Sequence, residues 1–210
     1  MKSLAVFASG GGSNFKAIHH SIISGKILGK IALLLSNNPN CGAVQFAEET
    51  GIANAIFNNS RYPEKKNRDD AILEILQDIE PDLIILAGYM KKIPDSVVHH
   101  FKSRIINIHP ALLPKFGGKG FFGMKVHQAV IEAGEDRSGA TVHFVNEEYD
   151  KGPIIAQENV IIDPQDSAES LAEKVLKIEH ELYPQVIKAY CEDRIIWKNN
   201  QPKIEEAIEN

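Results

Sequence analysis

The residue types with the clearest chemical potential occur in the segment Asn107-Ile108-His109-Pro110. This segment ends a predicted parallel strand, and open α/β sheets place their active sites at the carboxyl ends of such strands. Because side chains alternate along a strand, Asn107 and His109 are expected on the same face. The amide can donate a hydrogen bond to a developing oxyanion, and an imidazole with a pKa of about 6.5 can carry a proton. The pair is therefore a candidate catalytic centre.

A carboxylate beside His109 would orient the imidazole and favour its protonated form. The turn Glu148-Tyr149-Asp150-Lys151-Gly152-Pro153 lies between two predicted strands, and Asp150 is the leading candidate within it. On residue type alone, Glu147, Glu148 or Asp136 could serve equally well.

The glycine turn Ser9-Gly10-Gly11-Gly12-Ser13-Asn14 separates the first predicted strand from the first predicted helix. Glycines permit close backbone approach, and a helix N-terminus offers N–H groups to an anion. A dinucleotide site would need a glycine in place of Phe15 and an acidic residue after the second strand, which ends in Ser36-Asn37-Asn38. The sequence also lacks the Gly-Lys-Ser/Thr of a P-loop. A monophosphate is the better fit, and a purely structural tight turn is the alternative.

Short apolar runs alternate with longer amphipathic segments along the chain. Strands are predicted at residues 4–8, 31–35, 53–57, 83–87, 105–109, 140–145 and 154–162, with an edge strand at 195–197. Helices are predicted at about 14–24, 42–50, 69–79, 126–133 and 166–191, with a short one after Pro94. Apolar strands separated by helices indicate a parallel sheet covered on both faces. We expect a Rossmann-like α/β fold in a single domain, residues 1–198, followed by a polar C-terminal tail, residues 199–210.

The composition of the 210 residues, 43% hydrophobic and 24% charged, is typical of a soluble protein with its own core. The net charge of −5 argues against a general nucleic-acid binder. Cys41 and Cys191 form no pattern typical of a disulfide framework or a thiolate metal site. No apolar run reaches the roughly 18 residues of a membrane span, and the N-terminal run is too short for a signal peptide. We expect a cytoplasmic protein that binds neither nucleic acid nor membranes.

Basic residues are concentrated in residues 91–125, where the only acidic side chain is Asp95. The seven basic residues are Lys91, Lys92, Lys102, Arg104, Lys115, Lys119 and Lys125. A local positive field within an acidic protein suggests a site for small anionic ligands. A chance cluster of solvated lysines is the alternative.

Two motifs taken together give the chain a family resemblance. The segment Asn107-Ile108-His109-Pro110-Ala111-Leu112-Leu113-Pro114, combined with Tyr149-Asp150-x-Gly152-Pro153, resembles the folate-dependent formyltransferases. Gly12-Ser13-Asn14 and Leu86-Ala87-Gly88-Tyr89-Met90 make the chain similar to the branch that formylates phosphoribosylglycinamide in purine biosynthesis. This resemblance covers nearly the whole chain. It implies transfer of a formyl group from 10-formyltetrahydrofolate, as co-substrate, to the amine of glycinamide ribonucleotide.

The resemblance also implies roles for individual residues. The catalytic trio would be Asn107, His109 and Asp150, with His109 held protonated by Asp150 and no metal required. The ribonucleotide would be bound by Gly12, Ser13, Asn14 and Glu179. The folate would be bound by Lys65, Met90, Lys91, Lys92, Ile93 and Asn107. The partners would be small molecules, and the protein would be a monomer or a homodimer.

The chain departs from the family pattern in two places. Lys91-Lys92 stands where members often have an arginine and an apolar residue, and a lysine lacks the planar fork that grips carboxylates. Lys65 or Lys66 could supply the basic residue of the preceding loop. The glycine-rich loop Lys115–Gly123 is longer than usual, and its four glycines suggest a mobile lid.

Two other histidines follow the candidate centre along the chain. His143 alternates with Thr141 and Val145 on one strand face and is expected to be a satisfied near-core group. His127 is expected to begin a helix, although it could touch substrate. No histidine spacing makes a convincing metal site.

Other functions remain open at this point. A formyltetrahydrofolate deformylase would use the same trio with water as acceptor, and such proteins carry an additional N-terminal domain. A methionyl-tRNA formyltransferase would need a C-terminal RNA-binding domain, and another folate-dependent N-formyltransferase would use a different amine. A non-catalytic nucleotide-binding module would bind the phosphate ligand without consuming folate.

Overall fold

The structure is a computed structural model that describes residues 1–206. It divides into two compact units, residues 1–106 and a second unit that begins at Asn107, and the division falls within strand β5 (Ile105–His109). The first unit contains β1 (Lys2–Phe7), α1 (Ser13–Ile23), β2 (Gly29–Ser36), α2 (Gly42–Glu49), β3 (Asn54–Ile56), α3 (Lys65–Ile79), β4 (Leu83–Leu86) and α4 (Asp95–His100). The second contains α5 (Met124–Glu132), β6 (Arg137–Phe144), β7 (Ile154–Ile161), α6 (Ala168–Cys191), β8 (Ile195–Lys198) and β9 (Gln201–Ile204).

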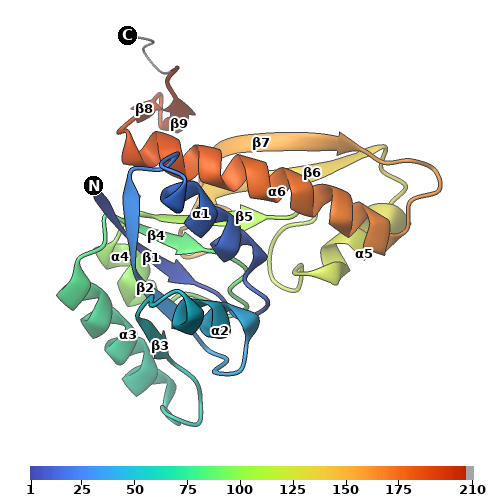
Figure 1. Cartoon of the computed structure of the whole chain (residues 1–210). Coiled ribbons are helices and arrows are strands. Elements are labelled where there is room, and N and C mark those ends of the chain that lie inside the picture. Colours follow the sequence, from blue (N-terminus) through green and yellow to red (C-terminus); the bar gives the residue numbers. More distant parts are fainter. Residues whose placement is uncertain (207–210) are drawn as a thin grey trace. The chain divides into compact units, whose positions relative to one another are not determined.

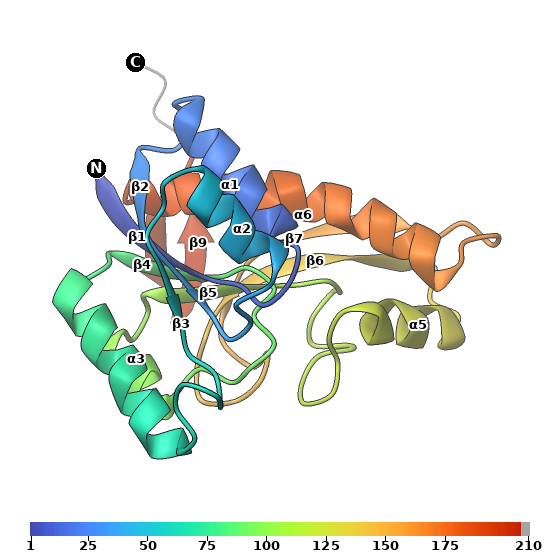
Figure 2. The same ribbon diagram turned by 60° about the horizontal axis from the view of Figure 1, so that its bottom comes forward.

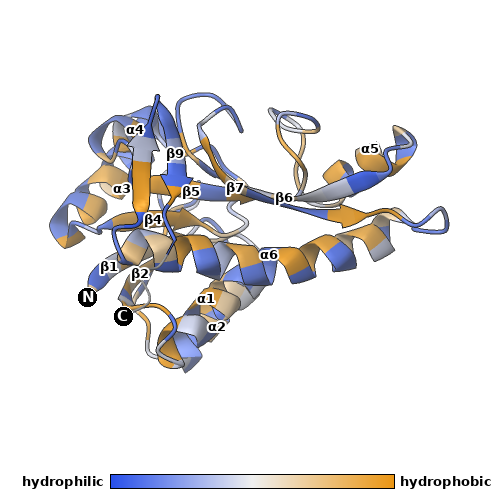
Figure 3. Ribbon diagram, turned by 90° about the horizontal axis from the view of Figure 1, so that it is seen from above, coloured by the Kyte–Doolittle hydropathy of each residue, from blue (hydrophilic) through white to orange (hydrophobic). Residues whose placement is uncertain are grey.

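The first unit is a parallel sheet with helices on both faces. Its strand order is β3-β2-β1-β4, followed by β5, and β1 pairs in parallel with both β2 and β4. The helices α1 and α2 cover one face, and α3 and α4 cover the other (Figures 2 and 3). Because both faces are covered, the central strands β1 and β4 contain runs of buried apolar residues, Leu4–Phe7 and Leu83–Leu86.

The second unit continues from β5 with β6 and β7. These two strands are antiparallel, and the long helix α6 packs against both of them and against α5 (Figure 1). Apolar and polar residues alternate around α6 with helical spacing, so one face of the helix can be buried (Figure 3). The predicted α/β class with a mainly parallel sheet is confirmed.

The structure corrects the prediction at the C-terminal end. Residues 199–210 were expected to form a polar tail, but Gln201–Ile204 pairs with Ile195–Lys198 in a hairpin. Asn199 and Asn200 both have positive φ, 53° and 59°, as a two-residue hairpin turn requires, and asparagine tolerates that conformation well. The remainder of the predicted tail, residues 207–210, lies outside the described residues.

Helix boundaries differ modestly from the prediction. The helix expected from residue 69 begins at Lys65, because the polar residues before Asp69 form its exposed first turn. Within residues 1–206, no helix combines the length and apolar character that a bilayer crossing requires.

Candidate active site

The carboxyl end of β5 positions the first two predicted catalytic residues. Asn107 is half-buried and His109 is buried, 3% exposed, with Ile108 between them on the opposite face. The chain after β5 is fastened to β6 by Thr141, whose hydroxyl donates to the carbonyl oxygen of Ala111 at 2.6 Å. The same hydroxyl oxygen accepts from the backbone N–H of Leu113 at 3.1 Å. The loop therefore leaves the strand in one defined direction.

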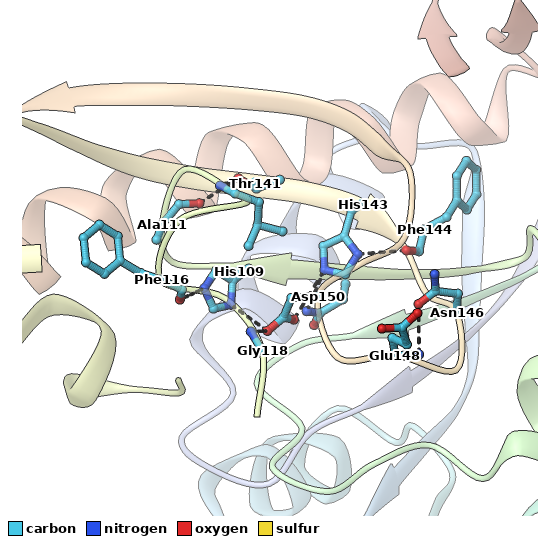
Figure 4. Close-up of polar contacts among 12 residues, drawn as sticks. His109, Ala111, Phe116, Gly118, Thr141, His143, Phe144, Asn146, Glu148 and Asp150 are labelled. Carbon is cyan, nitrogen blue, oxygen red and sulfur yellow. Dashed lines mark hydrogen bonds and ion pairs between the residues drawn. The ribbon is translucent and has the colours of Figure 1, made fainter. Parts of the chain in front are cut away.

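Asp150 is the carboxylate that lies beside His109. Its Oδ2 is 3.6 Å from Nδ1 of His109, and its Oδ1 is 3.6 Å from Nε2 of His143, so the carboxylate stands between two imidazoles (Figure 4). The backbone N–H of Gly118 also donates to Oδ2 at 2.8 Å. The three alternative carboxylates, Asp136, Glu147 and Glu148, are exposed.

The tautomer of His109 follows from its second contact. Nε2 lies 2.8 Å from the carbonyl oxygen of Phe116. A carbonyl oxygen only accepts hydrogen bonds, so Nε2 carries the hydrogen. In the neutral imidazole Nδ1 is then unprotonated, and it is the nitrogen that faces Asp150. A proton gained by His109 would therefore reside at Nδ1, next to the carboxylate.

Burial dominates the electrostatics of His109. Burial lowers the pKa of His109, and His143 lowers it further. The charge of Asp150 and the hydrogen bond with the carbonyl of Phe116 raise it. Together these effects leave the pKa of His109 below its usual value. Asp150 thus acts in the expected direction, opposing the effect of burial on His109. Burial alone would raise the pKa of Asp150, but His143, His109 and the N–H of Gly118 together lower it.

His143 is a site residue that the sequence reasoning did not identify. It is buried and hydrogen-bonded, as expected of a near-core group, but its contacts are with two of the predicted catalytic residues. Nε2 lies 3.2 Å from Nδ2 of Asn107 in addition to its approach to Asp150. The available signal was its alternation with Thr141 on β6, which places both residues on the face that meets the loop after β5.

His127 lies in the first turns of α5, as expected, but it is buried, at 5% exposed. Burial and the proximity of His109 lower its pKa. Its Nδ1 is buried without a hydrogen-bond partner among residues 1–206.

The glycine turn of the first unit ends at the N-terminus of α1. Gly12 occupies the N-cap with φ 73°, and a Cβ there would lie 2.9 Å from the backbone and side chain of Ala43 in α2. Glycine is therefore required both by conformation and by the close approach of the two helices. Ser13 is exposed and Asn14 is buried. Gly12 has no side chain that could cap α1, and the N–H groups at a helix N-terminus favour an anion.

A cavity of about 250 Å³ lies in the first unit, after the carboxyl ends of β2, β3 and β4. Its cationic lining consists of Arg68, Lys91 and Lys92, and its aromatic lining of Phe57 and Tyr89. Burial, opposed by the charge of Arg68, raises the pKa of Tyr89 to about 12, so the phenol stays neutral. Asp69 is the one carboxylate in the lining, so the cations outnumber it, and binding of a small anionic ligand here stays a prediction.

The other predicted folate-binding residues are distributed differently. Lys65 does not line the cavity but pairs with Asp69 on the surface of α3. Met90 is exposed, whereas Ile93 is buried in the core. Arg68, one turn further along α3, is the basic residue of this segment that lines the cavity. It was not anticipated because two lysines precede it closely in sequence.

Glu179 lies within α6 and is buried, 8% exposed, which is unusual for a carboxylate. Within residues 1–206, no cluster of three or more His, Cys, Asp or Glu side chains could hold a metal ion.

Comparison with known proteins assigns the family. A family model described as formyl transferase matches residues 2–187. The chain belongs to this family. The resemblance noted from the motifs around Asn107 and Asp150 is thereby confirmed, and with it the assignment to enzymes that transfer formyl groups.

Relatives within the formyl transferase family match almost the entire chain. The chain is 47% identical over 200 residues to the chloroplastic phosphoribosylglycinamide formyltransferase of Arabidopsis thaliana, covering 95% of this chain and 68% of that protein. It is 40% identical over 200 residues to the phosphoribosylglycinamide formyltransferase of Haemophilus influenzae, covering 95% and 92%. The solved structure of glycinamide ribonucleotide transformylase 1 from Symbiobacterium toebii matches with a TM-score of 0.90 at 33% identity, covering 98% of this chain and 95% of that one.

Proposed function

We propose that the protein transfers the formyl group of 10-formyltetrahydrofolate to the amine of glycinamide ribonucleotide, a step of de novo purine biosynthesis. Family membership and the activities named for its relatives support this function. The observation that carries the chemistry is the placement of Asp150 at Nδ1 of His109, with Nε2 held by the carbonyl of Phe116. Because Nε2 is engaged by a carbonyl oxygen, Nδ1, beside Asp150, is the nitrogen that would gain and lose the proton.

In the proposed reaction, the amine nitrogen attacks the formyl carbon, and the carbonyl electron pair moves to oxygen. The side-chain amide of Asn107 donates a hydrogen bond to this oxyanion. Nδ1 of neutral His109 accepts the proton released by the amine, and the resulting imidazolium is stabilised by Asp150. The same proton passes to the folate nitrogen as its bond to the formyl carbon breaks. The imidazole returns to its neutral form, so the proton count balances.

The two substrates are proposed to use the residues named from the family resemblance. The ribonucleotide phosphate would lie at the N-terminus of α1, bound by Gly12, Ser13 and Asn14, because the N–H groups and the dipole at a helix N-terminus favour an anion. Glu179 would contact the ribose or the glycinamide.

The carboxylate end of the folate would lie in the cavity beside Lys91 and Lys92, with Arg68 in the role first considered for Lys65 or Lys66. A guanidinium suits this role because its planar fork pairs with both oxygens of a carboxylate. Met90, Ile93 and Asn107 would complete the folate contacts. We further propose a cytoplasmic protein, monomeric or homodimeric, with small molecules as its partners and no metal requirement.

The test is release of tetrahydrofolate from 10-formyltetrahydrofolate, measured with and without glycinamide ribonucleotide. Release that depends on the ribonucleotide, accompanied by formylated product, is the expected result. Release without ribonucleotide would indicate a deformylase that uses water. No release under either condition would contradict the proposed acceptor and favour another amine or a non-catalytic role.

A further inference from the structure

His143 occupies an unusual position between two of the candidate catalytic residues. It is 2% exposed and lies next to the end of β6, where the pairing with β7 shifts register between Val142 and His143. Such bulges re-aim side chains and are common beside active sites. Here the imidazole lies against both Asn107 and Asp150. Figure 4 shows its approach to Asp150.

The hydrogen bonds of His143 determine which nitrogen donates. Nδ1 lies 2.8 Å from the carbonyl oxygen of Phe144, so Nδ1 carries the hydrogen. In the neutral imidazole Nε2 is then an acceptor. Nδ2 of Asn107, at 3.2 Å, is a donor that satisfies it. His143 therefore fixes which end of the Asn107 amide faces the imidazole.

This orientation matters because an asparagine amide has two chemically opposite ends. With Nδ2 at His143, one amide hydrogen is used by the imidazole and the second remains available for an oxyanion. If the amide turned over, Oδ1 would face Nε2, where two acceptors meet, and the position of the NH₂ group would change. His143 disfavours that turnover by leaving an acceptor without a donor.

We propose that His143 is a positioning residue for formyl transfer: its Nε2 holds the Asn107 amide in the orientation that donates to the oxyanion. Its Nε2 also lies 3.6 Å from Oδ1 of Asp150, on the side of the carboxylate opposite to His109. This inference rests on the proposed function, in which Asn107 is the oxyanion donor.

Two variants separate the roles of the two imidazole nitrogens. The amide of His143→Gln reaches the position of Nε2 and can accept from Asn107, but it loses the bond to Phe144. The shorter amide of His143→Asn reaches the position of Nδ1 and keeps the bond to Phe144, but it loses Asn107 and Asp150. A positioning role predicts that kcat of the glutamine variant stays within about tenfold of wild type. The asparagine variant should lose on the order of 10²-fold or more, as for loss of an oxyanion donor.

A purely structural role gives the opposite order. If packing and the bond to Phe144 were what mattered, the asparagine variant would be at least as active as the glutamine variant, and this order would overturn the proposal. Thermal unfolding of both variants ensures that kcat is compared between folded proteins. In an Asn107→Ala background, His143→Asn should cost much less than it does alone, and fully additive losses would also contradict the proposal.

A spectroscopic readout makes the inference independent of turnover. In ¹⁵N-labelled wild type, the side-chain NH₂ of Asn107 should give a distinct signal protected from solvent exchange. His143→Gln should retain that protection, and His143→Asn should abolish it. Equal protection in both variants would overturn the inference even if the enzyme is fully active. Absence of formyl transfer by wild type would instead count against the proposed function. The protection of the Asn107 NH₂ signal in the two variants would still decide whether His143 positions Asn107.

Discussion

Nε2 of His109 lies 2.8 Å from the carbonyl oxygen of Phe116, so the glycine-rich loop fixes the tautomer of the candidate catalytic histidine. The same loop donates the N–H of Gly118 to Asp150. Phe116 has φ 55°, a left-handed conformation that is uncommon outside glycine. The loop expected to act as a mobile lid thus supplies backbone groups to both His109 and Asp150.

Asp150→Asn should lower kcat by about 10²- to 10⁴-fold, the usual contribution of acid–base catalysis. The asparagine can still accept from Gly118 through its oxygen, so the fold should be retained. It cannot stabilise the imidazolium of His109. The pKa of His109 should also fall further below its usual value, because the charge of Asp150 raises it.

Steady-state rates and the pH profile of kcat measure both effects. Glu148→Gln is the matched control, because Glu148 is an exposed carboxylate in the same turn. It should behave as wild type. Near-normal turnover of Asp150→Asn would contradict the assigned role.

Gly12→Ala should destabilise the first unit and weaken ribonucleotide binding, whereas Gly11→Ala should do neither to a comparable extent. Alanine at position 12 must adopt φ 73° and place its Cβ 2.9 Å from Ala43. Strain and overpacking of this kind cost about 1–3 kcal/mol. At Gly11 a Cβ meets nothing within 4 Å. Denaturant unfolding and KM for the ribonucleotide are the measurements, and equal effects at both positions would contradict the close-packing argument.

The parts of the site that sequence predicted are those set by local pattern. Asn107 and His109 follow from alternation at the end of a strand, and Gly12 follows from a strand–glycine–helix sequence. The choice of Asp150 among four carboxylates did not follow from pattern. It depends on the φ of 55° at Asp150 and on Gly152, where a Cβ would lie 1.7 Å from the carbonyl oxygen of Phe144.

The features missed by the sequence depend on pairing between distant segments. His143 reaches Asn107 and Asp150 beside a register shift between β6 and β7, and no periodicity reports such a shift. Arg68 lines the cavity because of the side of α3 on which it lies. The sequence alone did not distinguish it from the lysines that precede it on the same helix. The C-terminal hairpin could have been predicted, since Asn199-Asn200 is a typical turn pair. The polar composition around this pair led instead to the prediction of a tail.

Arg68→Ala should raise KM for 10-formyltetrahydrofolate about tenfold and leave KM for the ribonucleotide nearly unchanged. The guanidinium lines the cavity, and one charge-assisted contact is worth about 1.5–3 kcal/mol. Lys66→Ala removes an exposed cation of the same helix that does not line the cavity, and it should have little effect. Measuring KM for both substrates in both variants decides whether Arg68 contacts the folate. A larger effect at Lys66 would place the folate tail elsewhere.

The free energy of unfolding should decrease as the pH falls from about 7.5 to about 5.5. Burial lowers the pKa of both His109 and His127 in the folded state. Below about pH 6.5 the unfolded chain takes up protons at these positions while the folded state resists them, so protonation favours unfolding. Each such histidine contributes at most about 1.4 kcal/mol per pH unit in this window.

His127→Gln should make this decrease smaller, because it removes one of the groups that unfolding allows to protonate. Its neighbour Gln128 is exposed and does not titrate, so Gln128→Ala controls for substitution on the same helix and should follow the wild-type pH dependence. Chemical denaturation at several pH values gives the slope for each protein. If His127→Gln reproduces the wild-type slope, His127 takes up its proton equally well folded and unfolded. The buried Nδ1 of His127 would then be no obstacle to the charged form.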